Sequence, residues 1–210
     1  MKSRICVLAV VLLSFTMVSN AQTIEKGATL IGGSINFGTS NQATINTAQP
    51  DTIKSTGGSI GISLGKAITD NGILGFSLSH GRTKIKSSMD EYDDDNRSSY
   101  AASIFYRQFL ELGNKFYFWI QPSAGINFGE VKSRDNSNYS KNMSVGLALT
   151  PGLSYNFYKS IYLDVSISNL AALSYNSSQA SGVKQESFHL SSGLSGGSLN
   201  NVGIGFSFIF

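Results

Sequence analysis

The sequence predicts an all-β fold: an eight-stranded antiparallel up-and-down transmembrane β-barrel that follows a cleaved signal peptide. Three observations support this prediction. Apolar and polar residues alternate through eight separate stretches of the chain. Short turns and long polar connectors alternate strictly between these stretches. In each stretch the large apolar residues share one face, while the other face consists mainly of glycine, serine and other polar residues.

The first 21 residues have the composition of a secretory signal. Lys2 and Arg4 precede an apolar run over 5–18, and small residues then precede position 22 in the pattern of a cleavage site. The run is shorter than the roughly 18 residues that a membrane helix needs, so we expect cleavage rather than a retained anchor. We therefore predict a signal peptide at 1–21 and a barrel domain at 22–210.

The composition is unusual for a soluble domain. Charged residues make up 14% of the chain, against roughly 25% in ordinary soluble domains. Of the 16 basic residues, two lie in the signal, so 14 basic and 13 acidic residues remain and the mature chain is nearly neutral. This balance does not suggest a nucleic-acid partner. The only cysteine, Cys6, lies in the signal, so we expect neither disulfides nor thiol chemistry in the mature chain.

The first three strands are expected at 28–38, 59–65 and 74–81. In each, isoleucine, leucine or phenylalanine alternates with glycine, serine or asparagine, as in a strand with one apolar face. The polar residues 39–53 are expected to form a long connector between the first two strands. Asp70-Asn71-Gly72 follows the second strand, and Asn-Gly is a strong signal for a tight hairpin turn.

The middle strands are expected at 98–110 and 116–128, on either side of a short turn at Gly113-Asn114. In the first of these, Tyr106 is assigned outward and Arg107 inward. The second has the clearest alternation, with seven apolar residues at every other position: Phe116, Phe118, Ile120, Pro122, Ala124, Ile126 and Phe128. The charged segment 86–97 and the polar segment 130–142 are expected to be loops.

The last strands are expected at 143–155, at 161–173 and at the C-terminus, where Val202, Ile204, Phe206, Phe208 and Phe210 alternate with small residues. A tight turn is expected at 158–160, and a long connector from Asn176 onward. The start of the final strand is left open, because Phe188, Leu190 and Leu194 keep the same alternation across a Gly/Ser-rich interval.

The apolar faces must point outward, toward lipid. A soluble barrel or sandwich is the rival interpretation, but eight strands enclose only enough room for ordinary side chains. A soluble fold would also leave a surface of glycine, serine and threonine with almost no charge. In an inside-out barrel the large residues meet lipid, the small polar residues line the interior, and closure satisfies every backbone group.

The chain resembles the small outer-membrane β-barrels of the OmpA and OmpX type. The signal, the eight alternating stretches and the ending Gly203-Ile204-Gly205-Phe206-Ser207-Phe208-Ile209-Phe210 support this resemblance. It implies an integral protein of the Gram-negative cell outer membrane, with both termini periplasmic, four long connectors outside, and contact with outer-membrane lipid and glycolipid. It also implies that Phe206, Phe208 and Phe210 form a C-terminal signal for the outer-membrane assembly machinery.

Six inward residues near the short turns are candidates for a lumen plug: Arg107, Tyr117, Trp119, Gln121, Tyr162 and Asp164. We expect Arg107 to pair with Asp164 across the lumen, below a wider cup lined by glycine and serine. These residues either hold the barrel shut, as is usual for small barrels, or gate a narrow pore.

Two further motifs suggest chemistry only weakly. The acidic run Asp90–Asp95 could bind calcium or bridge glycolipid through divalent ions, but it lacks the glycine and terminal glutamate of an EF-hand loop, so a solvated loop is the preferred interpretation. His189-Leu190-Ser191 is similar to the His-x-Ser pair of lipid A deacylases, but no acid follows Glu186.

The sequence therefore predicts a non-enzymatic barrel, without cofactor or metal, that anchors four outer loops for adhesion, envelope integrity or partner binding. A narrow pore or a transporter of small apolar ligands is the alternative function, and a deacylase-like enzyme is a weaker one. We expect the protein to be a monomer.

Overall fold

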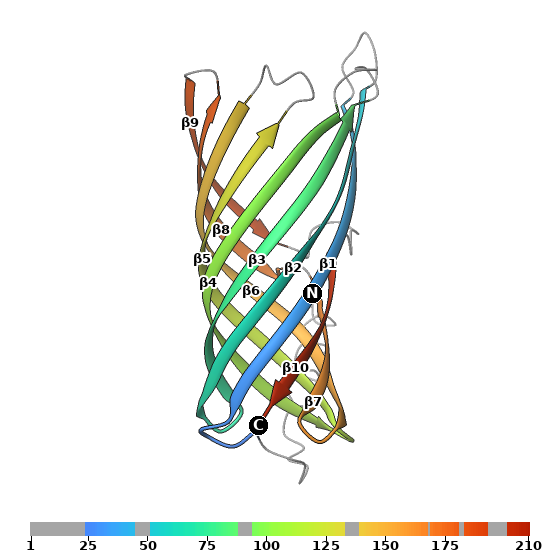
Figure 1. Ribbon diagram of the computed structural model, residues 1–210, viewed down its shortest axis with the longest axis vertical. Helices are drawn as coiled ribbons and strands as arrows, with labels where there is room; N and C mark the ends of the chain where they lie inside the picture. Colours follow the sequence, from blue (N-terminus) through green and yellow to red (C-terminus); the bar gives the residue numbers. More distant parts are fainter. Residues whose placement is uncertain are drawn as a thin grey trace, which may run out of the picture.

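The computed structural model describes residues 24–44, 51–87, 94–132, 139–167, 169–180, 183–192 and 201–210. Its strands are β1 (Thr29–Thr44), β2 (Asp51–Thr69), β3 (Gly72–Ser87), β4 (Asp94–Gly113), β5 (Phe116–Lys132), β6 (Tyr139–Tyr158), β7 (Ile161–Ile167), β8 (Ala171–Ala180), β9 (Val183–Ser192) and β10 (Asn201–Ile209). Figure 1 shows them wound around one axis with a strong common tilt.

Eight of these strands form a closed ring. The strand order β5-β4-β3-β2-β1-β10-β7-β6 is completed by pairing of β6 with β5, and every ladder is antiparallel. β8 continues the sheet along the edge of β6 beyond β7, and β9 pairs with β8. The predicted eight-stranded antiparallel barrel is therefore confirmed.

The apolar faces point away from the interior, as predicted. Ile60, Ile62, Ile104 and Leu147 are each 57–64% exposed on the outer wall, whereas their sequence neighbours on the inner face are only partly exposed. In a bilayer these exposed side chains contact acyl chains, so the outer wall has the polarity that the hydrocarbon requires. No helix among the described residues is long and apolar enough to cross a membrane.

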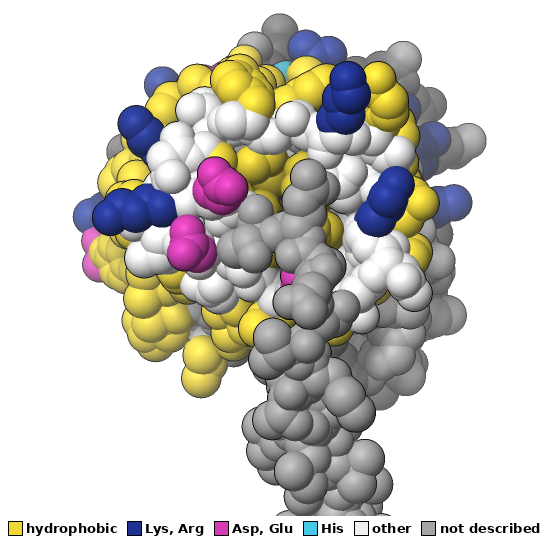
Figure 2. Space-filling model, turned by 90° about the horizontal axis from the view of Figure 1, so that it is seen from below, with side chains coloured by type: hydrophobic (Ala, Val, Ile, Leu, Met, Phe, Trp, Pro, Cys, Tyr) yellow, Lys and Arg dark blue, Asp and Glu magenta, His cyan; other side chains and the backbone are white. Residues whose placement is uncertain are grey.

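The predicted short turns lie together at one end of the barrel, which is also the end where the chain terminates (Figure 1). Asn71, Asn114 and Lys159 have positive φ angles of 60°, 52° and 42°. Asparagine adopts this left-handed conformation more readily than other side chains, and two such residues suffice to reverse a hairpin. Figure 2 shows this end from below, with cationic side chains around its rim and apolar side chains on the outer wall.

The predicted long connectors are shorter than expected, because the strands extend into them. β1 and β2 occupy much of 39–53, β3 and β4 enter 86–97, and β5 and β6 enter 130–142. A membrane barrel strand needs only about 9–11 residues to cross the hydrocarbon, but β4 and β6 have 20 each. Beyond the bilayer both faces of a hairpin meet water, so the alternation disappears and the paired residues have the composition of a loop.

The predicted strand 161–173 is interrupted, and the connector expected from Asn176 onward is largely strand. β7 ends at Ile167, and β8 runs from Ala171 to Ala180. On β6, Gly152 pairs with Ser166 and Leu149 pairs with Ala171. The chain advances five residues from Ser166 to Ala171, but only three residues along β6 between their partners. The chain from β7 to β8 is therefore two residues longer than the stretch of β6 that it faces. Because an even insertion keeps the same side chains facing outward, the sequence pattern does not reveal it.

Some sequence predictions lie outside the described residues. These are the signal peptide at 1–21, Leu194 in the Gly/Ser-rich interval, and most of the acidic run at 90–95, of which only the backbone of Asp94 and Asp95 is described, in β4.

Candidate functional site

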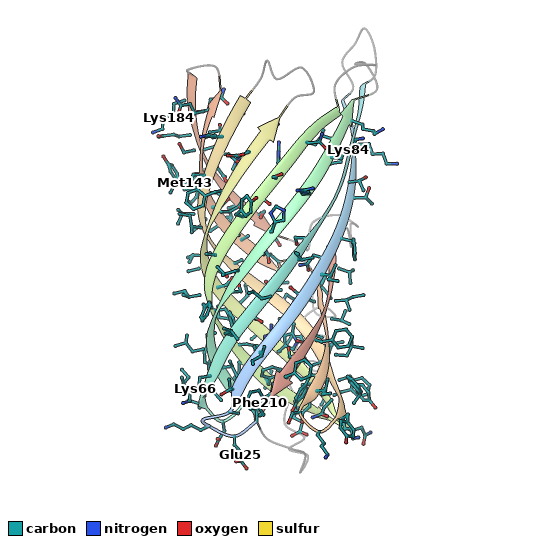
Figure 3. The ribbon with its side chains drawn as sticks, in the orientation of Figure 1. Glu25, Lys66, Lys84, Met143, Lys184 and Phe210 are labelled. Carbon is teal, nitrogen blue, oxygen red and sulfur yellow. The ribbon has the colours of Figure 1, made fainter. Side chains whose placement is uncertain are left out.

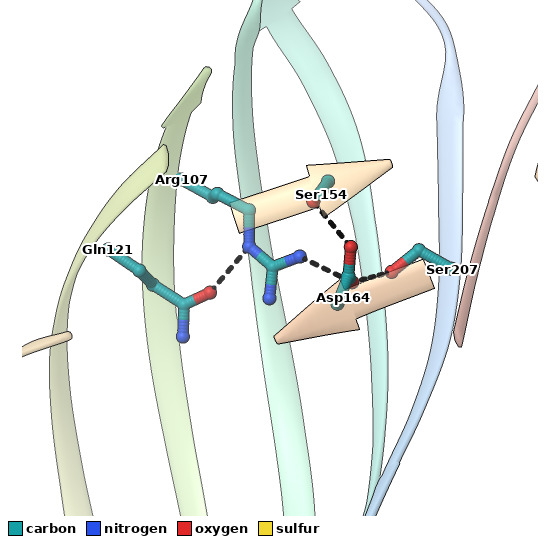
Figure 4. Close-up of polar contacts among 5 residues, drawn as sticks. All are labelled: Arg107, Gln121, Ser154, Asp164 and Ser207. Carbon is teal, nitrogen blue, oxygen red and sulfur yellow. Dashed lines mark hydrogen bonds and ion pairs between the residues drawn. The ribbon is translucent and has the colours of Figure 1, made fainter. Parts of the chain in front are cut away.

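A polar network crosses the barrel interior near the end that carries the short turns (Figure 4). Arg107 of β4 donates from Nε to Gln121 Oε1 of β5 at 2.8 Å. It also donates from Nη1 to Asp164 Oδ2 of β7 at 3.2 Å, which forms an ion pair across the lumen. Ser154 of β6 donates to Asp164 Oδ1 at 2.5 Å, and Ser207 of β10 donates to Asp164 Oδ2. Five strands are thus joined through one arginine and one aspartate.

The strand pattern places these side chains at one level. Each belongs to the inward set of its strand, and the β7 ladders pair Asp164 with Ser154 on β6 and with Gly205 on β10. On β5, Pro122 follows Gln121 and faces outward. Because proline has no backbone N–H group, it cannot donate a hydrogen bond to the ladder with β4. Arg107 and Asp164 are 9% and 8% exposed, so both charges are largely removed from solvent.

Aromatic rings surround the guanidinium of Arg107. Its Cζ lies 4.3 Å from the centroid of Trp119 and 5.8 Å from the centroids of Phe105 and Phe109. Such cation–π contacts stabilise a buried cation that is otherwise short of water. The Trp119 ring lies over Gly152 of β6, where even a Cβ atom would collide with it. Glycine at this position therefore makes room for the indole.

A second layer of rings lies against the first. The Tyr117 ring meets Phe109 edge-on at 6.3 Å and Tyr162 at 5.6 Å between centroids. Tyr117 and Tyr162 are 1% and 5% exposed. The structure therefore brings together all six residues of the candidate plug, with Arg107, Gln121 and Asp164 hydrogen-bonded and the three aromatic residues packed beside them.

The floor of the barrel includes a residue that sequence reasoning missed. Ile24, which precedes β1, is 4% exposed and belongs to the same buried cluster as Leu30 and Ile73. Its N–H donates to Asn71 Oδ1 at 2.9 Å, and its carbonyl accepts from Asn71 N at 2.8 Å. The segment before β1 is thus held across the end of the barrel by the turn between β2 and β3. A lone isoleucine outside the alternating stretches gives no sequence signal for this role.

Above the ion pair the interior widens into a polar cup. A cavity of about 230 Å³ lies directly on the network and is lined by Arg107, Gln121, Asp164, Ser207 and small residues of β1–β3. A larger one of about 560 Å³ lies beyond it, lined mainly by glycine, serine, threonine and asparagine. The predicted cup thus exists, and its lining offers hydrogen bonds but little charge.

The weaker candidates gain no supporting geometry. His189 Nε2 lies 3.0 Å from Ser187 Oγ rather than bonding to Ser191, and these residues are exposed on β9. The nearby Glu186 forms an ion pair with Lys184 at 2.5 Å, and this hydrogen bond lowers the pKa of Glu186 and raises that of Lys184. Within the described part of the chain, no three histidine, cysteine or acidic side chains are grouped as a metal site would require.

The C-terminal phenylalanines lie on the outer wall. Phe206, Phe208 and Phe210 are 45–65% exposed, and Phe210 exchanges two backbone hydrogen bonds with Thr29 at the start of β1. Their placement leaves all three rings accessible from the lipid side.

A closed antiparallel barrel with an apolar outer wall and a polar interior defines the class of integral outer-membrane β-barrel proteins. Comparison with known families agrees. The chain belongs to the family described as the outer membrane protein beta-barrel domain, whose model matches residues 8–210. The chain is therefore an integral protein of the outer membrane. No curated protein sequence matches it.

Several solved outer-membrane barrels have a similar fold. OprG from Pseudomonas aeruginosa is 14% identical, with 89% of this chain and 97% of that chain covered and a TM-score of 0.49. Neisserial surface protein A is 18% identical, with 88% and 100% covered and a TM-score of 0.48. The attachment invasion locus protein Ail of Yersinia pestis is 13% identical, with 88% and 99% covered and a TM-score of 0.46.

Proposed function

We propose that this protein is a non-enzymatic membrane anchor whose closed barrel holds four stiff hairpins outside the cell for adhesion, envelope integrity or partner binding. The observation that carries this proposal is the network centred on Arg107 and Asp164, because it joins five strands across the lumen and rests on two layers of packed rings. A solute that entered the cup would meet this plug before it reached the other end.

The length of the hairpins supports the display role. β2, β4 and β6 have 19, 20 and 20 residues, roughly twice what the hydrocarbon requires. At about 3.3 Å per residue and a tilt of about 40°, the additional residues carry the sheet about 20 Å beyond the bilayer. A hydrogen-bonded sheet holds the outer ends of its strands in a fixed arrangement, which a set of free loops would not do.

The proposed orientation places the short turns and both termini in the periplasm. Membrane barrels have short periplasmic turns and longer extracellular connections, and here the two kinds lie at opposite ends. Because the mature sequence has no cysteine of its own, single cysteines can report on the orientation. We expect Lys141→Cys to react with an impermeant maleimide on intact cells, and Glu25→Cys to react only after the outer membrane is opened. The reverse pattern would refute the orientation.

Conductance in planar bilayers tests the closed barrel. We expect the refolded mature chain to insert without a steady conductance. A steady conductance that Arg107→Ala widens or abolishes would instead establish the narrow pore that is the alternative function. The deacylase-like alternative is tested separately, by comparing lipid A acyl chains from cells with and without the protein. We expect no difference, since His189 and Ser191 are not brought together.

A further inference from the structure

The floor of the polar cup presents hydrogen-bond donors that no described residue uses. Arg107 donates from Nε to Gln121 and from Nη1 to Asp164, while its Nη2 has no partner in the described part of the chain. Gln121 accepts through Oε1, and its Nε2 also lacks a partner among the described residues. Arg107 is only 9% exposed, and both residues line the cavity of about 230 Å³ above the network. The two free nitrogens therefore depend on whatever fills this cavity.

Both free nitrogens point into the cup. β7 begins beside the short turn at Lys159 and runs toward the outer end of the barrel (Figure 1). In Figure 4, Nη2 of Arg107 and Nε2 of Gln121 lie on the side of the network toward which the β7 arrow points. The carboxylate at the same level is already engaged, because Asp164 accepts from Arg107, Ser154 and Ser207. The floor thus offers the cup donors rather than acceptors.

Free hydroxyl groups lie on the wall above these donors. Four serines line the same cavity without a hydrogen bond to any described residue: Ser34, Ser63, Ser79 and Ser166. Their neighbours in the ladders are mostly small, and Ser34, for example, lies between Gly61 of β2 and Gly205 of β10. No long neighbouring side chain covers the hydroxyl of Ser34, so it is open to the cup.

The cup has room for a molecule larger than water. The cavity at the floor adjoins the larger one of about 560 Å³, since Asn36, Thr150 and Ser166 line both. Long side chains of the wall project outward instead, as Figure 3 shows for Lys66 and Met143. Volumes of this order are typical of sites for small molecules.

The lining disfavours charged and apolar ligands. Arg107 and Asp164 balance each other's charge at 3.2 Å, so an anion beside Nη2 would also be repelled by the nearby carboxylate. The described residues that line the larger cavity include no charged side chain. An apolar ligand would displace water from the free donors without replacing its hydrogen bonds. Hydroxyl groups match this lining, because each can accept from the nitrogens and can both donate to and accept from the serines.

We propose that the cup binds a small neutral saccharide, a mono- or disaccharide. Its hydroxyl oxygens accept hydrogen bonds from Arg107 Nη2 and Gln121 Nε2, and adjacent hydroxyls exchange hydrogen bonds with Ser79 and Ser166. The ion pair stays intact, so the saccharide rests on the plug and does not pass it. Binding in a closed cup requires neither conductance nor a particular orientation, so the proposal is independent of the experiments on those two points.

Binding is tested by titrating the refolded mature chain with glucose, N-acetylglucosamine and maltose, followed by saturation-transfer NMR. The detergent must have no sugar headgroup, because a glycoside could occupy the same site. We expect saturable binding of at least one saccharide in the millimolar range. Glucuronate should bind at least about fivefold more weakly than glucose, since its carboxylate approaches Asp164. Absence of saturable binding for all three saccharides would overturn the site, and tighter binding of glucuronate would overturn the neutral ligand.

Three variants locate the site within the cup. Ser79→Ala and Ser166→Ala each remove a hydroxyl that bonds to no described residue, so we expect folded barrels that bind about fivefold more weakly. Gln121→Glu keeps an oxygen that accepts from Arg107 but replaces the free donor with an acceptor, and it should weaken binding about tenfold.

Ser187→Ala is the matched control, because it removes an exposed hydroxyl of β9 that lines neither cavity. We expect it to change binding by less than about twofold. Heat-modified migration on gels verifies that each variant is folded. Unchanged binding in the three cup variants, or an equal loss with Ser187→Ala, would overturn this location.

Discussion

The ion pair between Arg107 and Asp164 should be strongly coupled, and a double-mutant cycle measures this. The three variants are Arg107→Met, Asp164→Asn and the two changes together. In Arg107→Met, the Asp164 carboxylate keeps its bonds from Ser154 and Ser207 but loses the only cation that it contacts among the described residues. In Asp164→Asn, the guanidinium keeps its bond to Gln121 and its contact with the Trp119 ring.

The expected magnitudes follow from this asymmetry. Removing one partner of a buried ion pair usually destabilises a protein by about 3–5 kcal/mol. Because each remaining charge here keeps other partners, we expect about 2–3 kcal/mol for each single variant. With both charges gone, no uncompensated ion remains, so the double variant should lose about as much as one single variant. The coupling free energy then has a magnitude of about 2–3 kcal/mol, well above the 0.5 kcal/mol or so at which residues count as independent.

Trp119 provides the assay. It is the only tryptophan in the chain, and its ring lies 4.3 Å from the Arg107 guanidinium. Unfolding by urea in lipid vesicles, followed by tryptophan fluorescence, gives the free energy of unfolding of all four proteins. A coupling below about 0.5 kcal/mol would refute the reasoning, since it would mean that the two charges do not depend on each other.

Three other predictions concern the wall and its closure. Gly152→Ala should destabilise the barrel by about 1–3 kcal/mol, because the added methyl group collides with the Trp119 ring. Gly33→Ala is the control, since no atom lies within 4 Å of the added Cβ. This control should unfold at nearly the same urea concentration as the parent protein. Leu147→Arg should destabilise the folded barrel in vesicles by about 1–3 kcal/mol, and Leu147→Met should have little effect, since position 147 is exposed on the apolar outer wall. Equal stability of the two variants would contradict this placement. Phe210→Ala should reduce the amount of folded barrel in the outer membrane of cells, while the purified variant should still refold in detergent. An equal loss of folded barrel in cells and in detergent would argue against an assembly signal.

The sequence predicted the membrane-crossing half of the fold well, because lipid imposes a strict alternation there. Exposed Ile60 and Leu147 and buried Tyr117 and Trp119 all lie on the predicted faces. The same alternation placed Arg107 and Asp164 on inward faces, and a lone arginine and aspartate inside a narrow barrel have few other partners.

Other features left no such signal. The hairpins beyond the bilayer have water on both sides, so β1 as far as Thr44 resembles a loop in composition. Ser154 and Ser207 hold Asp164, but serine is common on every inward face, and nothing in the sequence distinguishes these two. The stretch between β7 and β8 exceeds the facing part of β6 by an even number of residues, so the alternation continues across it unchanged.

The unequal strand lengths have a consequence for how the barrel comes apart. β10 has nine residues and β7 has seven, whereas β1–β6 have 16 to 20. The seam that joins the two chain ends is therefore closed by ladders shorter than any of those among β1–β6, and it brings together segments that are remote in sequence. Such contacts form late in folding, and local opening is easiest where fewest bonds must break. Amide hydrogens of β10 should consequently exchange with deuterium sooner than those of β4 or β5.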